Sequence, residues 1–115
     1  MTAGAPERHP ALGLDDVVHQ KTRLALLTVL DEAHRADFPY LKRTLGLTDG
    51  NLGRHLDMLA AQDLVEITKG YEGRRPRTWM TITAQGRRAL AAEMALLTTL
   101  LQRFEHSKAR HNTDT

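Results

Sequence analysis

The sequence contains no cysteine among its 115 residues. Disulfide bonds are therefore excluded, and so are metal or redox sensors built on thiolates. The only serine is Ser107, and no histidine and carboxylate accompany it in a nucleophile motif. A phosphate-binding loop is absent as well, because Gly70, Gly73 and Gly86 lack the surrounding pattern. We therefore expect a protein without enzyme activity.

Long apolar runs are also missing. No stretch reaches the roughly 20 apolar residues of a membrane-spanning helix, and the opening segment MTAGAPERHP lacks the apolar core of a signal peptide. We therefore expect a cytoplasmic protein, and the length is that of one domain. The formal net charge of +2 does not by itself indicate a nucleic-acid partner.

Residues 48–63, TDGNLGRHLDMLAAQD, predict an amphipathic helix. Thr48 is a good N-cap, and Asp49 places a negative charge at the positive end of the helix dipole. The apolar residues recur at the spacing of one helical face: Leu52, Leu56 and Leu59. The outer face is unusually free of bulk, because it carries Gly50, Asn51, Gly53 and Arg54. Such a face suits a helix that lies in a groove.

The residues before this helix predict a second, shorter helix. Pro39 suits a first helical turn, and Leu41 and Leu45 supply an apolar face. Gly46 can end that helix in the left-handed conformation, so that Leu47 leads directly into the Thr48 cap. A helix, a short glycine turn and a second helix form the pattern of a helix-turn-helix.

A β-hairpin is predicted next. Residues 64–69 and 78–83 alternate like strands, and the glycine- and arginine-rich segment 70–77 is expected to form a long tip between them. Lys69, Arg74, Arg75 and Arg77 crowd this hairpin, with only Glu72 against them. Such a hairpin is a wing, and Trp79 is expected to anchor its base by packing.

A long helix is predicted from its N-cap at Thr83 to about His106. Its apolar residues fall at alternating spacings of four and three, the seam of a coiled coil: Leu90, Met94, Leu97, Leu101 and Phe104. Either this helix folds back on its own domain or it forms a homodimer interface. A single small domain cannot cover so long an apolar stripe, which favours the dimer.

The predicted domain spans residues 12–106 and includes the dimerisation helix at about 83–106. Residues 1–11 and 107–115 are polar and are expected to be flexible tails. Another amphipathic helix is expected from Lys21 to Arg35, with Leu24, Leu27 and Leu30 inward.

Residues 20–90 resemble the winged helix-turn-helix regulators of the MarR and ArsR kind, above all a small bacterial group of winged helix DNA-binding domains. The motifs that carry the resemblance are LGLTDGNLGRHLDML at 45–59, DLVEITKGYEGRRPRTW at 63–79 and TITAQGRRAL at 81–90. The resemblance implies a mainly α fold with a small β-hairpin wing (α+β) and a long C-terminal dimerisation helix. It also implies that the N-terminal apolar residues Leu12, Leu14 and Val17 pack on the dimer partner.

The implied function is that of a transcriptional regulator binding double-stranded DNA as a homodimer. Helix 48–62 would read a near-palindromic operator in the major groove, and the wing at 70–77 would bind the backbone or minor groove. The expected DNA contacts are Thr48, Asp49, Gly50, Asn51, Gly53, Arg54, Lys69, Arg74, Arg75 and Arg77.

For Arg54 and Asn51 on this face, the sequence leaves two roles open. Arg54 suits the two acceptors of guanine, or else a phosphate, and Asn51 either reads adenine or braces the first turn. Asp57 is expected to pair with Arg54 at i, i+3. His55 flanks the buried stripe and is expected to be structural.

Other functions are weaker readings of the same residues. A winged helix can serve as a protein-interaction module without DNA binding, but such modules lose the basic residues that this wing keeps. No cofactor is expected, and no metal either, because Glu105 and His106 lack the Asp-x-His half of the zinc site found in some ArsR relatives. A small-molecule effector would bind in the dimer cleft, between the N-terminal segment and the long helix.

Overall fold

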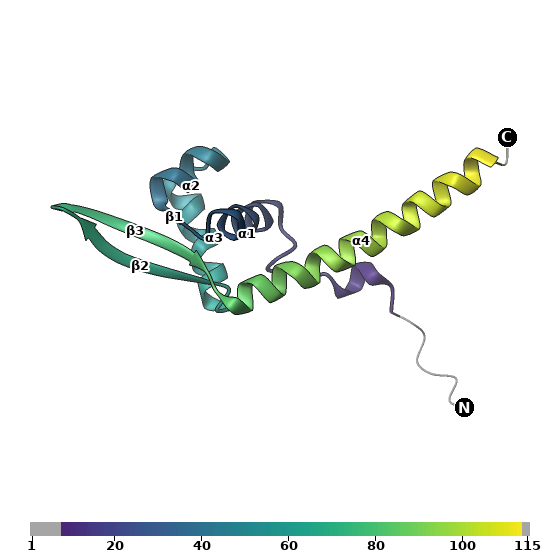
Figure 1. Ribbon diagram of the computed structural model, residues 1–115, viewed down its shortest axis with the longest axis horizontal. Helices are drawn as coiled ribbons and strands as arrows, with labels where there is room; N and C mark the ends of the chain where they lie inside the picture. Colours follow the sequence, from purple (N-terminus) through teal and green to yellow (C-terminus); the bar gives the residue numbers. More distant parts are fainter. Residues whose placement is uncertain (1–7, 114–115) are drawn as a thin grey trace, which may run out of the picture.

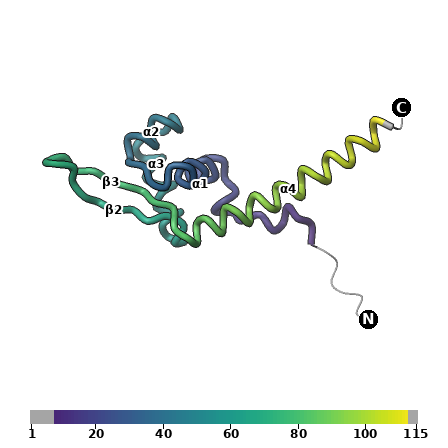
Figure 2. Tube along the Cα trace, in the orientation of Figure 1, coloured from purple at the N-terminus to yellow at the C-terminus, as the bar shows by residue number. Residues whose placement is uncertain are grey.

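The computed structural model describes residues 8–113, and its element order is that of a winged helix (Figures 1 and 2). The elements are η1 (Pro10–Gly13), α1 (Lys21–Ala33), β1 (Arg35–Asp37), α2 (Phe38–Leu45), α3 (Asp49–Ala61), β2 (Val65–Glu72), β3 (Arg75–Ile82) and α4 (Ala84–Thr113). The expected fold class, mainly α with a hairpin wing and a long C-terminal helix, is confirmed. Of the two expected tails, residues 1–7 and 114–115 lie outside the described part of the chain.

The core lies between α1, α2, α3, the first turns of α4 and one face of the sheet. Leu26, Leu27 and Leu30 of α1 are fully buried, whereas Leu24 is only partly buried. The buried face of α1 therefore includes Leu26 in place of the predicted Leu24. The helix also ends at Ala33 rather than Arg35, because His34 has a φ of 67° and the chain then enters β1.

The sheet is antiparallel throughout, with the strand order β1-β3-β2. The ladder between β2 and β3 continues to Glu72 and Arg75, so the wing is mostly paired strand and its tip is only Gly73 and Arg74. This corrects the prediction of a long loop at 70–77. Pro76 is tolerated because β1 reaches β3 only at residues 79–81, which leaves an unpaired edge beside the proline.

Helix α4 begins as predicted, with the Thr83 hydroxyl accepting from the Gly86 amide at 2.8 Å. Gly86 is required by close packing, because a Cβ there would overlap with the backbone oxygen of Leu64. The helix continues to Thr113, which corrects both the end predicted near His106 and the flexible tail from residue 107. Neither glycine nor proline occurs between 107 and 113 to stop it.

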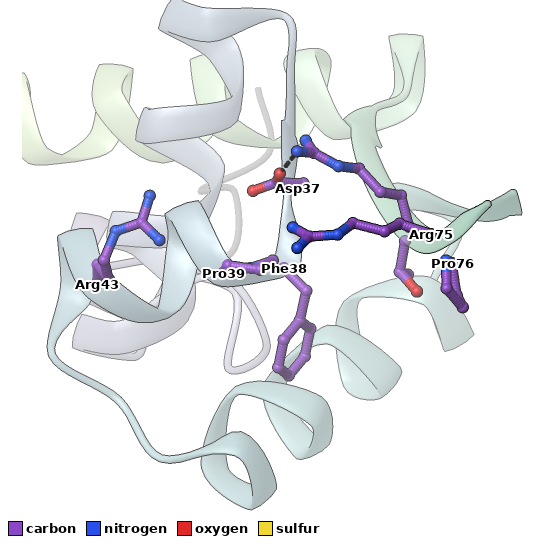
Figure 3. A pocket seen from close by; sticks show the side chains of 8 residues that line it. Asp37, Phe38, Pro39, Arg43, Arg75 and Pro76 are labelled. Carbon is purple, nitrogen blue, oxygen red and sulfur yellow. Dashed lines mark hydrogen bonds and ion pairs between the residues drawn. The ribbon is translucent and has the colours of Figure 1, made fainter. Parts of the chain in front are cut away.

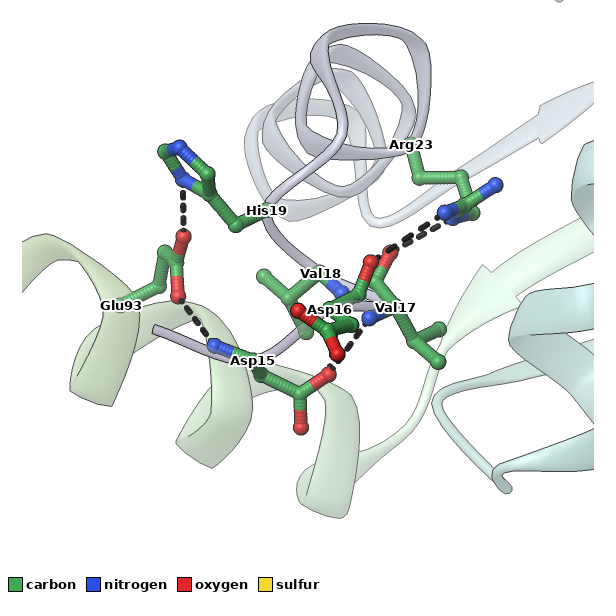
Figure 4. Close-up of polar contacts among 7 residues, drawn as sticks. All are labelled: Asp15, Asp16, Val17, Val18, His19, Arg23 and Glu93. Carbon is green, nitrogen blue, oxygen red and sulfur yellow. Dashed lines mark hydrogen bonds and ion pairs between the residues drawn. The ribbon is translucent and has the colours of Figure 1, made fainter. Parts of the chain in front are cut away.

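The N-terminal segment packs on the chain's own α4, as Figure 2 shows for η1. Its anchor is Glu93, a carboxylate on α4 that is only 2% exposed. Glu93 Oε2 lies 2.5 Å from Nδ1 of His19, and Oε1 accepts from the Asp15 amide at 3.3 Å (Figure 4). Within residues 8–113, none of the helices combines the length and the hydropathy that a membrane crossing requires.

Candidate nucleic-acid interface

The helix-turn-helix is fixed by three local devices. Asp37 caps α2 by accepting from the Tyr40 amide at 2.9 Å. Gly46 follows α2 in the left-handed conformation, with φ 63° and ψ 41°. Thr48 then caps α3 by accepting from the Asn51 amide at 3.2 Å. The predicted turn at Gly46 and both predicted ends of α2 are thereby confirmed, and so is the predicted cap of α3 at Thr48.

The outer face of α3 is open to solvent, and its polar residues interact with one another. Arg54 donates to the side-chain oxygen of Asn51 at 3.3 Å, and both residues are exposed. Asp49 pairs with Lys42 of α2 at 2.8 Å. The expected pair between Asp57 and Arg54 is not formed, because the guanidinium turns toward Asn51, one helical turn back.

Gly50 and Gly53 sit on this helix without a packing reason to be glycine. A Cβ built at either position would have no neighbour within 4 Å. A side chain there would therefore fit the chain itself, while glycine weakens a helix by roughly 1 kcal/mol relative to alanine. The two glycines therefore add no side-chain bulk to the outer face of α3.

The inner face of α3 meets a buried arginine. Arg23 of α1 is 7% exposed, and its Nη1 lies 3.1 Å from Nδ1 of His55, which is 9% exposed. Burial, and then the charges of Arg23 and Arg54, lower the pKa of His55 below its ordinary value. His55 is therefore a structural residue, as predicted, and its neutral ring accepts from Arg23.

The arginines of the wing are not equivalent. Lys69, Arg74 and Arg75 are exposed, and none of them takes part in an ion pair within residues 8–113. Arg77 is only 34% exposed and pairs with Asp37 at 2.6 Å and with Glu72 at 3.4 Å. The first three are thus available to an external anion, whereas Arg77 is held within the chain.

Trp79 lies at the base of the wing, where it was expected. The Arg35 guanidinium lies 4.1 Å from the centroid of its ring, and that of Arg77 lies 5.5 Å away. The tryptophan thus packs against cationic side chains of β1 and β3 on the outer face of the sheet. This arrangement supports the wing base from within the chain.

A cleft of about 490 Å³ separates α2 from the wing (Figure 3). Its lining is strongly basic and comes from both elements: Asp37, Phe38, Pro39, Arg43, Arg75, Pro76, Arg77 and Thr78. Arg43 was not among the predicted DNA contacts. Its place in the last turn of α2, next to the glycine turn, is the sequence signal that could have pointed to it. Asp37 was missed as well, although an aspartate just before Phe-Pro is an N-cap signal.

The residues predicted for dimerisation differ widely in exposure. Leu90 is 7% exposed and packs in the chain's own core, so little of its side chain is accessible. Leu14, Val17 and Leu97 are half-buried. The remaining predicted residues are exposed: Leu12 at 61%, Met94 at 39%, Leu101 at 57% and Phe104 at 63%. The alternative that α4 folds back is wrong for its last part, since every residue from 101 to 112 is exposed.

The sequence and the fold both match known proteins. The family model described as winged helix DNA-binding domain matches residues 22–101. An uncharacterised protein of Methanocaldococcus jannaschii is 37% identical over 71 residues, which are 62% of this chain and 77% of the relative.

Solved structures of regulators share the fold. The transcriptional regulator homologue of Pyrococcus horikoshii OT3 has a TM-score of 0.80 at 24% identity and covers 84% of this chain and 98% of its own. A MarR-family regulator of Enterococcus faecalis V583 has a TM-score of 0.67 at 25% identity, covering 95% and 99%. The repressor CouR, solved on a 23-mer DNA duplex, has a TM-score of 0.66 at 26% identity, covering 88% and 76%. The chain therefore belongs to the winged helix DNA-binding domain family and is a DNA-binding regulator of the MarR-like kind.

Proposed function

We propose that this chain regulates transcription as a homodimer that reads a near-palindromic operator. In each protomer α3 lies in the major groove, with Thr48, Asp49, Gly50, Asn51, Gly53 and Arg54 against the DNA. The wing lies on the backbone or in the minor groove, with Lys69, Arg74 and Arg75 as its contacts. The family supplies the DNA-binding class, and CouR is a structural relative that was solved on a duplex.

The observation that carries the proposal is the outer face of α3. Its glycines have open space around them, and its one arginine is exposed and is braced by Asn51. Asn51 accepts from Arg54 and so orients its guanidinium, a role distinct from the adenine reading and the bracing of the first turn that the sequence left open. A braced guanidinium suits bidentate contact with O6 and N7 of guanine.

The wing supports the proposal through its free cations. Arg74 is at the tip and Arg75 lines the cleft beside α2, and neither forms an ion pair within residues 8–113. Arginines placed in this way gain from the negative potential of phosphates and of a narrow minor groove. Asp49 is compatible with DNA because Lys42 neutralises it.

The free end of α4 supports a second copy of the chain as its partner. The stripe that contacts the chain's own core at Leu90 continues along the same face as Leu97, Leu101 and Phe104. The C-terminal part of the helix projects away from the domain, as Figure 1 shows, and residues 101–112 are exposed to solvent. An identical helix offers a complementary seam, and a two-fold dimer matches a palindromic site.

An effector site is part of the same proposal. A cavity of about 500 Å³ lies between the N-terminal segment and α4, lined by Arg8, His9, Pro10, Thr99 and Arg103. Its position between these two segments supports a small-molecule effector there, and its two arginines favour an anionic one.

Selection of binding sites from random duplex DNA with the full chain tests the proposal. The expected result is enrichment of two inverted half-sites about one helical turn apart, each protected in footprinting. Binding without enrichment of any sequence would contradict the reading role of α3. Failure to bind duplex at low salt, where phosphate contacts are strongest, would leave the protein-interaction module as the better function.

A further inference from the structure

Asp37 has two side-chain oxygens, and each serves a different element. Oδ1 accepts from the Tyr40 amide at 2.9 Å and thereby caps α2, the first helix of the helix-turn-helix. Oδ2 accepts from Nη1 of Arg77 at 2.6 Å, and Arg77 belongs to β3 of the wing. The Asp37 carboxylate, with a side chain only 13% exposed, thus joins the start of the helix-turn-helix to the wing (Figure 3).

Arg77 is held on more than one side. Its Nε lies 3.4 Å from Oε2 of Glu72 across the hairpin, and its guanidinium lies 5.5 Å from the Trp79 ring. Two carboxylates therefore neutralise this arginine, while Arg75 and Arg43 in the same cleft have no ion pair within residues 8–113.

We infer that Arg77 is a positioning residue, and that the Asp37–Arg77 pair fixes the wing relative to the helix-turn-helix. This inference rests on the proposed function in that it assigns different roles to the arginines of the DNA-binding wing. Arg75 is left to contact the DNA backbone, together with Arg43 across the cleft, whereas Arg77 acts through Asp37. The pair is half-buried and charge-assisted, which makes it stronger than an exposed ion pair.

The first test needs no DNA. Trp79 is the chain's only tryptophan, so its fluorescence reports on the wing base alone. Asp37→Ser keeps a good N-cap, but its single oxygen is used by the cap and leaves nothing for Arg77. Arg77→Met removes the guanidinium and leaves the cap untouched. We expect both variants to increase acrylamide quenching of Trp79, with no further increase in the double variant.

The matched control is Arg75→Met, which removes an arginine from the same cleft without touching Asp37. Its quenching should equal that of the unaltered protein. If quenching is unchanged in Arg77→Met, or if the two single effects add up in the double variant, the pair does not hold the wing. Unchanged quenching in Arg77→Met overturns the inference even if Asp37→Ser impairs the folding of α2.

The second test measures affinity for the selected operator across a salt series. Asp37→Ser removes a negative charge, so simple electrostatics predicts tighter binding, whereas loss of a positioning pair predicts weaker binding. We expect Asp37→Ser and Arg77→Met to weaken binding by the same factor at every salt concentration. Arg75→Met should instead reduce the slope of log affinity against log salt by about one per protomer.

The result that would overturn the inference is a loss of slope in Arg77→Met as large as that in Arg75→Met, with tighter binding by Asp37→Ser. Arg77 would then be a phosphate contact. If the protein binds no duplex, the proposed function fails, and the quenching of Trp79 still decides whether the pair holds the wing.

Discussion

Nη1 of Arg23 lies 3.1 Å from Nδ1 of His55, so a buried guanidinium of α1 donates to a buried imidazole of α3. The same arginine donates to the carbonyl oxygens of Val17 at 2.6 Å and Asp16 at 3.3 Å (Figure 4). It therefore joins the N-terminal segment to the inner face of α3. A proton on His55 would remove the acceptor and place two cations in contact.

Stability should therefore fall in mildly acidic solution through His55. Its pKa is below 6.5 in the folded chain, so as pH falls through about 6.5 the unfolded chain takes up a proton that the folded chain refuses. The free energy of unfolding decreases over this window and becomes level below the lowered pKa. The slope from one proton is at most about 1.4 kcal/mol per pH unit. Urea titrations between pH 5 and 8 measure it.

His55→Asn separates this effect from the other histidines, because asparagine offers an oxygen near the place of Nδ1 and does not titrate. The difference in pH slope between this variant and the original protein is the contribution of His55. His34→Asn is the matched control, since His34 is exposed and its φ of 67° suits asparagine. Equal slopes in all three proteins would show that the buried contact does not govern acid stability.

Dimerisation should fail when charge is placed on the exposed stripe of α4. Leu101 and Phe104 are more than half exposed, so Leu101→Glu with Phe104→Glu should leave the fold intact and give a monomer in sedimentation. Operator affinity should fall at least about tenfold, because a single half-site supplies too few contacts.

Gln102→Glu with His106→Glu is the control for this pair. It adds the same charge on another face of the same exposed segment, and it should remain dimeric. A stripe variant that still sediments as a dimer would place the interface elsewhere.

Arg74→Ala should weaken binding to operator and to random duplex by nearly the same factor. Arg74 is at the two-residue tip of the wing, where a backbone or minor-groove contact carries little base information. The salt slope should decrease by about one per protomer. Changed sequence preference with an unchanged slope would assign the tip to base reading instead.

Local sequence signals predicted the caps and the turn that hold α3 in place. Thr48 and Gly46 act between neighbours in the chain, and a cap or a left-handed turn needs only the residues beside it. The wing arginines were found by their clustering, because charge in a hairpin can be read without three-dimensional information.

The role of Arg77 could not be read in the same way. Its partner Asp37 is forty positions away in the sequence, and only the pairing of β1 with β3 brings the two together. Gly86 is a similar case, because its need for glycine comes from the carbonyl of Leu64 and not from its own helix. The buried face of α1 was predicted incorrectly because it includes Arg23, a charged residue. Arg23 can be buried only because its hydrogen-bond acceptors come from other segments of the chain.

Arg54→Ala should test sequence reading by α3. The loss on the operator should be on the order of 1–3 kcal/mol, with a much smaller loss on random duplex. Discrimination should relax at one base pair in each half-site, and a repeated site selection with the variant measures this. Equal losses on both kinds of DNA would make Arg54 a phosphate contact.

Gly50 gives the sharpest separation of folding from binding. A Cβ at Gly50 meets nothing within 4 Å, so Gly50→Leu should fit the free chain and raise its stability by up to about 1 kcal/mol, because leucine is the better helix former. Its bulk on the outer face of α3 would nevertheless keep the helix out of the groove, and operator binding should collapse. Gly50→Ala should have an intermediate operator affinity, because one methyl group reduces only slightly how far α3 can enter the groove. Thermal unfolding and operator affinity, measured on both variants, should therefore move in opposite directions. If Gly50→Leu binds the operator normally, α3 is not the reading helix, and a protein partner becomes the better occupant of this face.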